Sequence, residues 1–170
     1  MGVKRGFRWA RSADDQLAFI IELSDRIRQT FAAAVDPVLS HGDIEPYNIL
    51  VSANGPILID WESVACQSAT LEIGRAALSF GGKEIEQIRR ILQAYVDADG
   101  ELAAIGEDLF LRSVSLQLCH TAERIGVMVE GDTSPGWLDV QDLDARTADE
   151  LAALPGMVDR LNRLARSCAV

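Results

Sequence analysis

Apolar residues recur every three or four positions along most of this 170-residue chain, which is the spacing of amphipathic helices. The first run follows Ser12-Ala13-Asp14-Asp15, a pattern that predicts a capping box, and it stops at Pro37. Its apolar positions are Leu17, Ile20, Ile21, Ile27, Phe31 and Ala34. Residues 1–37 therefore predict an N-terminal helix with one apolar face.

The same spacing predicts helices after residue 63. One covers about 71–80 and ends at Gly81-Gly82, and a second begins at about Ile85 and ends near Gly100. A longer helix is expected over 111–125. His120 lies among its apolar positions, so we expect this histidine to be buried. Residues 147–166 predict two helical pieces, because Pro155-Gly156 should interrupt the helix.

Between residues 49 and 59 the pattern changes to two short apolar runs. Ile49-Leu50-Val51-Ser52 and Pro56-Ile57-Leu58-Ile59 flank Ala53-Asn54-Gly55, which is typical of a β-hairpin with an Asn-Gly turn. A hairpin brings its two ends together. We therefore expect Asn48 and Asp60 to lie side by side.

Composition narrows the class of protein. Hydrophobic residues make up 48% and charged residues 25%, as expected for one globular domain. A net charge of −10 argues against nucleic-acid binding and suits a cationic ligand. Three cysteines without a C-x-x-C pattern predict neither a disulfide framework nor a zinc site. No apolar run is long enough to cross a membrane, so we expect a cytoplasmic protein.

The chemistry is concentrated in one motif. His41-x-Asp43-x4-Asn48 fits the catalytic-loop pattern of kinases, in which the Asp accepts the proton of the attacking hydroxyl and the Asn holds a metal ion. Asn48 and Asp60 would supply two hard oxygen ligands, which suit Mg²⁺ bridging nucleotide phosphates. The spacing predicts a phosphotransferase site.

The run HGDIEPYN followed by ILIDWE resembles the catalytic core of the aminoglycoside phosphotransferase and choline kinase family. This family has a protein-kinase-like fold. The resemblance covers 38–62 and continues to about Gly82 through Leu71–Ala77, which looks like the next helix of the family. It implies an α+β, mainly α fold in which residues 1–170 form a single kinase-like C-terminal lobe. Within it, 38–62 would carry the catalytic loop and metal-binding hairpin, and 63–170 a helical subdomain.

Carried over to this sequence, the resemblance assigns a role to each motif residue. Asp43 would be the catalytic base and His41 would support the catalytic loop. Asn48 and Asp60 would bind Mg²⁺ and, through it, the nucleotide. The implied reaction transfers the γ-phosphoryl group of ATP or GTP to a hydroxyl of a small molecule. Relatives with this motif use different acceptors, so the motif does not name one.

Several neighbouring residues depart from the family pattern or allow two interpretations. Glu45 and Tyr47 stand where members often carry His and Gly, so both are candidate substrate contacts. Glu62 either contacts a cationic substrate or is an ordinary solvated or ion-paired carboxylate. We expect Trp61 to lie in the core. Glu72 and Arg75 are one helical turn apart, and we expect them to form an ordinary surface or interlobe pair.

The part of a kinase that binds the nucleotide has no counterpart in this sequence, which leaves a second interpretation open. In such enzymes a separate lobe with a glycine-rich loop clamps the nucleotide, whereas only 40 residues precede His41 here. We therefore expect a C-terminal lobe without its partner lobe. It could be a non-catalytic remnant, a small-ligand-binding module or half of a split kinase, and its exposed face predicts an N-lobe chain or a second copy as partner.

Overall fold

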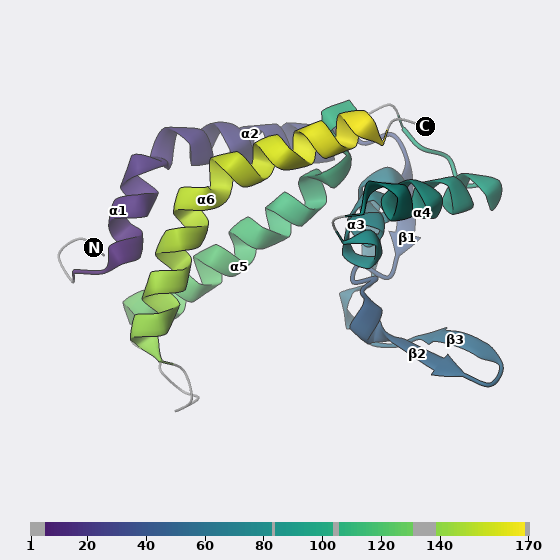
Figure 1. Cartoon of the computed structure of the whole chain (residues 1–170), viewed down its shortest axis with the longest axis horizontal. Helices are drawn as coiled ribbons and strands as arrows, with labels where there is room; N and C mark the ends of the chain where they lie inside the picture. Colours follow the sequence, from purple (N-terminus) through teal and green to yellow (C-terminus); the bar gives the residue numbers. More distant parts are fainter. Residues whose placement is uncertain (1–5, 83, 104–105, 131–138, 169–170) are drawn as a thin grey trace. The chain divides into compact units, whose positions relative to one another are not determined.

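Helices dominate the computed structural model, which describes residues 6–82, 84–103, 106–130 and 139–168 (Figure 1). Its α-helices are α1 (Arg8–Asp15), α2 (Leu17–Ala32), α3 (Ala69–Gly81), α4 (Ile85–Asp97), α5 (Leu111–Glu130) and α6 (Val140–Ser167). Short 3₁₀ helices cover Pro46–Asn48 (η2), Trp61–Ser63 (η3) and Gly106–Phe110 (η4). The mainly α, α+β fold class is confirmed. No helix in these ranges is long and apolar enough to cross a membrane.

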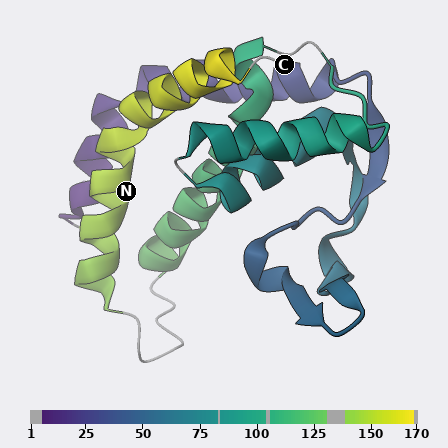
Figure 2. The same cartoon turned by 45° about the vertical axis from the view of Figure 1, so that its right-hand side comes forward.

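Two small antiparallel sheets complete the fold. Strands β2 (Ile49–Ser52) and β3 (Gly55–Leu58) form the predicted hairpin, with Ile49 opposite Leu58. Figure 1 and Figure 2 both show it extending away from α3 and α4. The second sheet pairs β1 (Pro37–Ser40) with β4 (Ala65–Ser68). This pairing was not predicted, because its strands are short and residues 41–64, with the catalytic loop and the hairpin, lie between them.

The chain divides into two compact units. The first contains Met1–Arg28 and Val114–Arg160, and the second contains Gln29–Ser113 and Leu161–Val170. Both sheets, α3 and α4 belong to the second unit. Every residue of the predicted catalytic motif therefore lies in that unit.

The N-terminal helix differs from its prediction. It begins at Arg8 instead of after Ser12, and it is interrupted at Gln16 between α1 and α2. The backbone N–H groups of Arg8 and Trp9 donate to the two carboxylate oxygens of Asp144, each at 3.0 Å. A carboxylate from α6 thus caps α1. No local signal around residue 8 could reveal a cap that comes from so far along the chain.

Helix α6 also overrides its sequence signal. It continues through Pro155, although proline removes one backbone hydrogen bond and crowds the preceding turn. Leu151, Leu154 and Val158 are buried around this position, so packing on both sides of the proline keeps the helix continuous. His120 on α5 is exposed, so its predicted burial is wrong.

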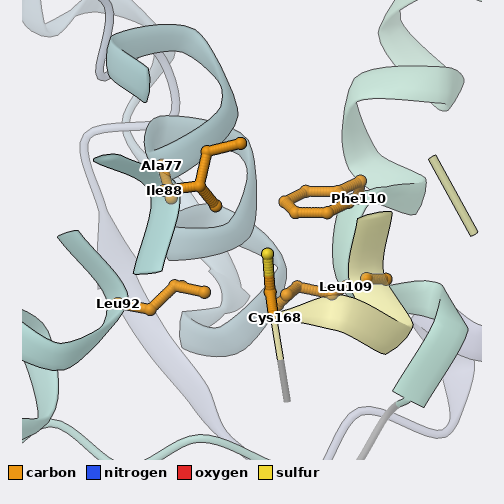
Figure 3. Close-up of a cluster of buried hydrophobic side chains, with 7 residues drawn as sticks. Ala77, Ile88, Leu92, Leu109, Phe110 and Cys168 are labelled. Carbon is orange, nitrogen blue, oxygen red and sulfur yellow. The ribbon is translucent and has the colours of Figure 1, made fainter. Parts of the chain in front are cut away.

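The core of the second unit holds α3 in place. Ala77, Ile88, Leu92, Leu109, Phe110 and Cys168 form its buried centre (Figure 3). A Cβ atom at Gly74 would lie 2.2 Å from the carbonyl oxygen of Leu109, so only glycine allows α3 to approach η4 this closely. Helix α3 ends at Gly81 with Gly82 as its C-cap, and α4 ends at Asp97, both as predicted.

The start of α3 is capped from two sides. Ser68 accepts from the backbone N–H of Leu71 at 3.2 Å, and Asp36 Oδ2 accepts from the backbone N–H of Thr70 at 2.8 Å. The Thr70 hydroxyl donates to the same oxygen at 2.5 Å. Partial burial raises the pKa of Asp36, but the hydrogen bonds from Thr70 and Ser68 outweigh it and hold this pKa below its usual value.

We expect Asp36→Ala to destabilise the chain by about 1 kcal/mol at pH 7, the usual cost of losing a cap. A lowered pKa means that the ionised carboxylate stabilises the folded state above its ordinary pKa of 3.8, and that this contribution is lost as the pH falls further. The difference in stability between the variant and the wild type should therefore shrink as the pH falls below 3.8. Urea unfolding at several pH values measures this, and a constant difference would contradict it.

Candidate active site

The catalytic loop connects β1 to the hairpin. It leaves β1 at Ser40, runs through residues 41–45 and enters η2 at Pro46, whose fixed φ suits the first position of a helix. The backbone N–H of Asn48 donates to the Glu45 carbonyl at 3.0 Å and closes this turn. Both ends of the loop are therefore fixed by regular structure.

His41 is buried and joins the loop to the segment before Asp60. Its Nδ1 accepts from the backbone N–H of Asp43 at 3.2 Å, and its Nε2 lies 2.9 Å from the carbonyl oxygen of Ile59. A nitrogen that accepts from an N–H carries no proton, so Nε2 carries it and donates to Ile59. The Trp61 ring packs edge-on against the imidazole, with ring centroids 4.7 Å apart.

Both carboxylate oxygens of Asp43 accept hydrogen bonds. Arg75 donates to Oδ1 at 2.6 Å and the Asn48 amide donates to Oδ2 at 2.7 Å. The Tyr47 hydroxyl lies 3.5 Å from Oδ2, at the limit of a hydrogen bond. Partial burial raises the pKa of Asp43, but Arg75, Asn48 and Tyr47 outweigh it and lower this pKa. The carboxylate is therefore ionised at neutral pH and acts only as an acceptor.

The buried amide of Asn48 has a defined orientation. Its nitrogen donates to the backbone oxygen of Asp43 at 2.9 Å as well as to Oδ2, and both partners are acceptors. The nitrogen is thus committed to Asp43, which leaves Oδ1 as the oxygen that could bind a metal.

The hairpin brings the segment before Asp60 beside Asn48, because the Ile59 N–H donates to the Asn48 carbonyl at 2.9 Å. Asp60 is exposed and has a left-handed backbone, with φ 65° and ψ 65°. Such a conformation costs a non-glycine residue about 1 kcal/mol or more and is enriched at functional sites.

The side-chain oxygens of Asn48 and Asp60 are of the kind that a magnesium ion shared with phosphates would bind. Mg²⁺ prefers oxygen ligands and commonly takes one or two from the protein, with phosphate and water completing its shell. The Asn48 amide oxygen and the Asp60 carboxylate are such donors. Across the residues that the structure describes, no group of three or more His, Cys, Asp or Glu side chains could hold a metal alone.

Glu72 and Arg75 do not form the surface or interlobe pair that their spacing predicts, because both are buried and neither pairs with the other. Their residues are only 5% and 7% exposed, and each pairs with a different partner. Glu72 forms an ion pair with Arg112 and accepts from the Ser40 hydroxyl at 2.9 Å, whereas Arg75 binds Asp43 and Glu45. The signal that could have revealed this is the presence of two charges in an otherwise apolar helix segment.

Both arginines also bind the backbone of the loop. Arg75 and Arg112 donate to the carbonyl oxygen of Gly42, each at 3.3 Å, and the Gly42 N–H lies 3.3 Å from the Ser40 hydroxyl. Gly42 has a φ of +81°, and a Cβ there would lie 2.2 Å from the Ser63 carbonyl oxygen. The loop therefore needs glycine at this position for two independent reasons.

The three predicted substrate contacts differ in availability. Glu45 is bound to Arg75 at 2.6 Å and accepts from the Ser79 hydroxyl, so its carboxylate is already engaged. Tyr47 is 70% exposed, and Glu62 is exposed as well. Trp61 is 58% exposed, so its predicted place in the core is wrong, and its Nε1 donates to the Leu58 carbonyl at 2.9 Å.

A family model described as "Phosphotransferase enzyme family" matches residues 4–105. The chain belongs to this phosphotransferase family. The match contains the catalytic loop, the hairpin and α3, and it confirms the resemblance that the HGDIEPYN and ILIDWE segments predict. Comparison with curated proteins and with solved structures found no match.

We expect Gly42→Ala to distort the catalytic loop. The left-handed backbone alone should cost about 1–2 kcal/mol, and the contact with Ser63 adds to it. Thermal unfolding should show the loss. Gly55→Ala is the matched control, because Gly55 also has a positive φ but a Cβ there meets no atom within 4 Å. Equal losses in the two variants would contradict a specific clash at Gly42.

Proposed function

We propose that this chain transfers the γ-phosphoryl group of ATP or GTP to a hydroxyl of a small molecule. The observation that supports this most directly is the Asp43 carboxylate, held at one oxygen by Arg75 and at the other by Asn48. Asp60 follows the strand that pairs with the Asn48 segment. A fixed acceptor beside two metal-binding oxygens is what phosphoryl transfer requires.

In this mechanism Asp43 receives the hydroxyl proton of the acceptor. The acceptor oxygen forms a bond to the γ-phosphorus, the bond from that phosphorus to the β–γ bridging oxygen breaks, and the nucleoside diphosphate leaves. A carboxylate with a lowered pKa is a weak base, so its main contribution is to orient the hydroxyl. The loose transition state of phosphoryl transfer needs little proton removal before the bond to phosphorus forms.

Asn48 and Asp60 would hold Mg²⁺ in this proposal. When bound, the ion neutralises charge that develops on the β and γ phosphates. Asn48 contributes its Oδ1 because its nitrogen is committed to Asp43, so this side chain links the acceptor-binding and nucleotide-binding sides of the site. His41 keeps the two backbone segments in register through Asp43 and Ile59.

We further propose a kinase-like C-terminal lobe over residues 1–170 and a nucleotide-clamping lobe, on another chain or segment, that meets the hairpin. In support, β2 and β3 carry no charged residue and expose Leu50, Val51 and Ile57 by 53%, 90% and 50%. A second copy of the chain is the other candidate partner. A cationic acceptor suits the net charge of −10 and the exposed carboxylates of Asp60 and Glu62.

Calorimetric titration of Mg·ATP, combined with phosphate release to water, tests these roles. Asp43→Asn should lower turnover by about 10²-fold or more while nucleotide affinity stays within a few-fold. The reason is that only the attacking O–H group, here that of water, loses the carboxylate that orients it and receives its proton. Asp60→Ala should weaken both binding and turnover, because it removes a metal ligand.

Asp97→Asn is the control, since Asp97 is an exposed carboxylate on α4 outside the site. Equal loss of Mg·ATP affinity in the Asp43 and Asp60 variants would contradict the separate roles. A wild-type chain that binds no Mg·ATP would contradict nucleotide binding by this chain alone.

A further inference from the structure

The mechanism above leaves Arg75 without an assigned task. Its side chain is only 8% exposed, and one nitrogen, Nη2, lies 2.6 Å from Asp43 Oδ1 and 2.6 Å from Glu45 Oε1. The Ser79 hydroxyl donates to the other oxygen of Glu45. The catalytic carboxylate, a buried cation and a second anchored carboxylate therefore form one connected group.

The wider group also contains the Glu72–Arg112 ion pair, because both arginines donate to the Gly42 carbonyl. Three carboxylates (Asp43, Glu45, Glu72) and two guanidinium groups (Arg75, Arg112) leave one formal negative charge. A guanidinium group does not lose its proton in proteins and has no acceptor, so Arg75 compensates Asp43 permanently. Its interaction with Asp43 is therefore a fixed part of the site.

Arg75 and Asn48 bind opposite oxygens of the Asp43 carboxylate. With Asn48 alone, the carboxylate could turn about its Cβ–Cγ bond, because terminal carboxyl torsions are broad. A donor on each oxygen removes this freedom and fixes the direction of the remaining lone pairs. Holding an acceptor within a fraction of an ångström of its productive position is a large part of catalysis by orientation.

We propose that Arg75 is the positioning residue of the catalytic carboxylate, and that Glu45, anchored by Ser79, holds Arg75 in place instead of contacting the acceptor. The inference rests on the proposed function only in naming Asp43 as the carboxylate that receives the acceptor proton. It reassigns Glu45, which the sequence predicts as a substrate contact.

A purely structural role is the alternative, since Arg75 also donates to the Gly42 carbonyl at 3.3 Å and could simply hold the loop. The side-chain NH₂ of Asn48 distinguishes the two roles. It donates to Asp43 Oδ2, which moves with the carboxylate, and to the Asp43 backbone oxygen, which moves only with the loop. Its two proton resonances therefore report separately on carboxylate orientation and on loop position.

The test is an NMR measurement of the Asn48 side-chain NH₂ in the ¹⁵N-labelled chain, without nucleotide. In Arg75→Gln, the proton bonded to Oδ2 should shift toward the value of a free Asn, and the other should stay in place. Glu45→Ala should cause a smaller shift of the same resonance and should add nothing in the Arg75→Gln background, because Glu45 acts through Arg75. Arg89→Ala, at an exposed arginine of α4, should change neither resonance.

Arg75→Lys provides a second measurement if Arg75→Gln does not fold. It keeps the charge but lacks the planar fork, so it should shift the same proton and lower Mg·ATP turnover by about 10²-fold with an unchanged KM. If both resonances move together, or neither moves, the proposal is overturned. The NMR result does not depend on nucleotide binding, so it separates failure of this inference from failure of the proposed function.

Discussion

The site depends on the pairing of buried charges between α3 and the catalytic loop. Burying an unpaired ion costs several kcal/mol, so the charges on this helix can remain in the interior only if partners meet them. Arg75 meets Asp43 and Glu45, and Glu72 meets Arg112. Both arginines also bind the Gly42 carbonyl, so the loop backbone takes part in the same network. Removing one partner would leave several groups unsatisfied at once.

This network is only as precise as the position of α3. Gly74 lets the helix approach the Leu109 carbonyl, and the core around Ala77, Ile88 and Phe110 fixes its other contacts (Figure 3). Asp36 and Ser68 cap its first turn from the segments that precede it. Residues that do not contact Asp43 thus determine where Arg75 lies. Packing at the core reaches the Asp43 carboxylate through one rigid helix.

Local sequence patterns predicted the local structure, but they could not predict contacts between residues far apart in the sequence. The hairpin, the ends of α3 and α4 and the spacing of His41, Asp43 and Asn48 each depend on residues close in sequence. The cap of α1 by Asp144 and the burial of Glu72 and Arg75 depend on partners more than thirty residues away. A periodicity argument places a charge on a helix face but cannot show which distant group neutralises it.

The arrangement around Asp43 favours orientation over basicity. A stronger base would need fewer donors, whereas each donor that fixes the carboxylate also lowers its pKa. Phosphoryl transfer tolerates a weaker base that is better oriented, because its loose transition state needs a well-placed hydroxyl more than an early proton transfer. In the proposed function, the order that α3 imposes on the loop would hold Asp43 for the acceptor and the Asn48 oxygen for the metal.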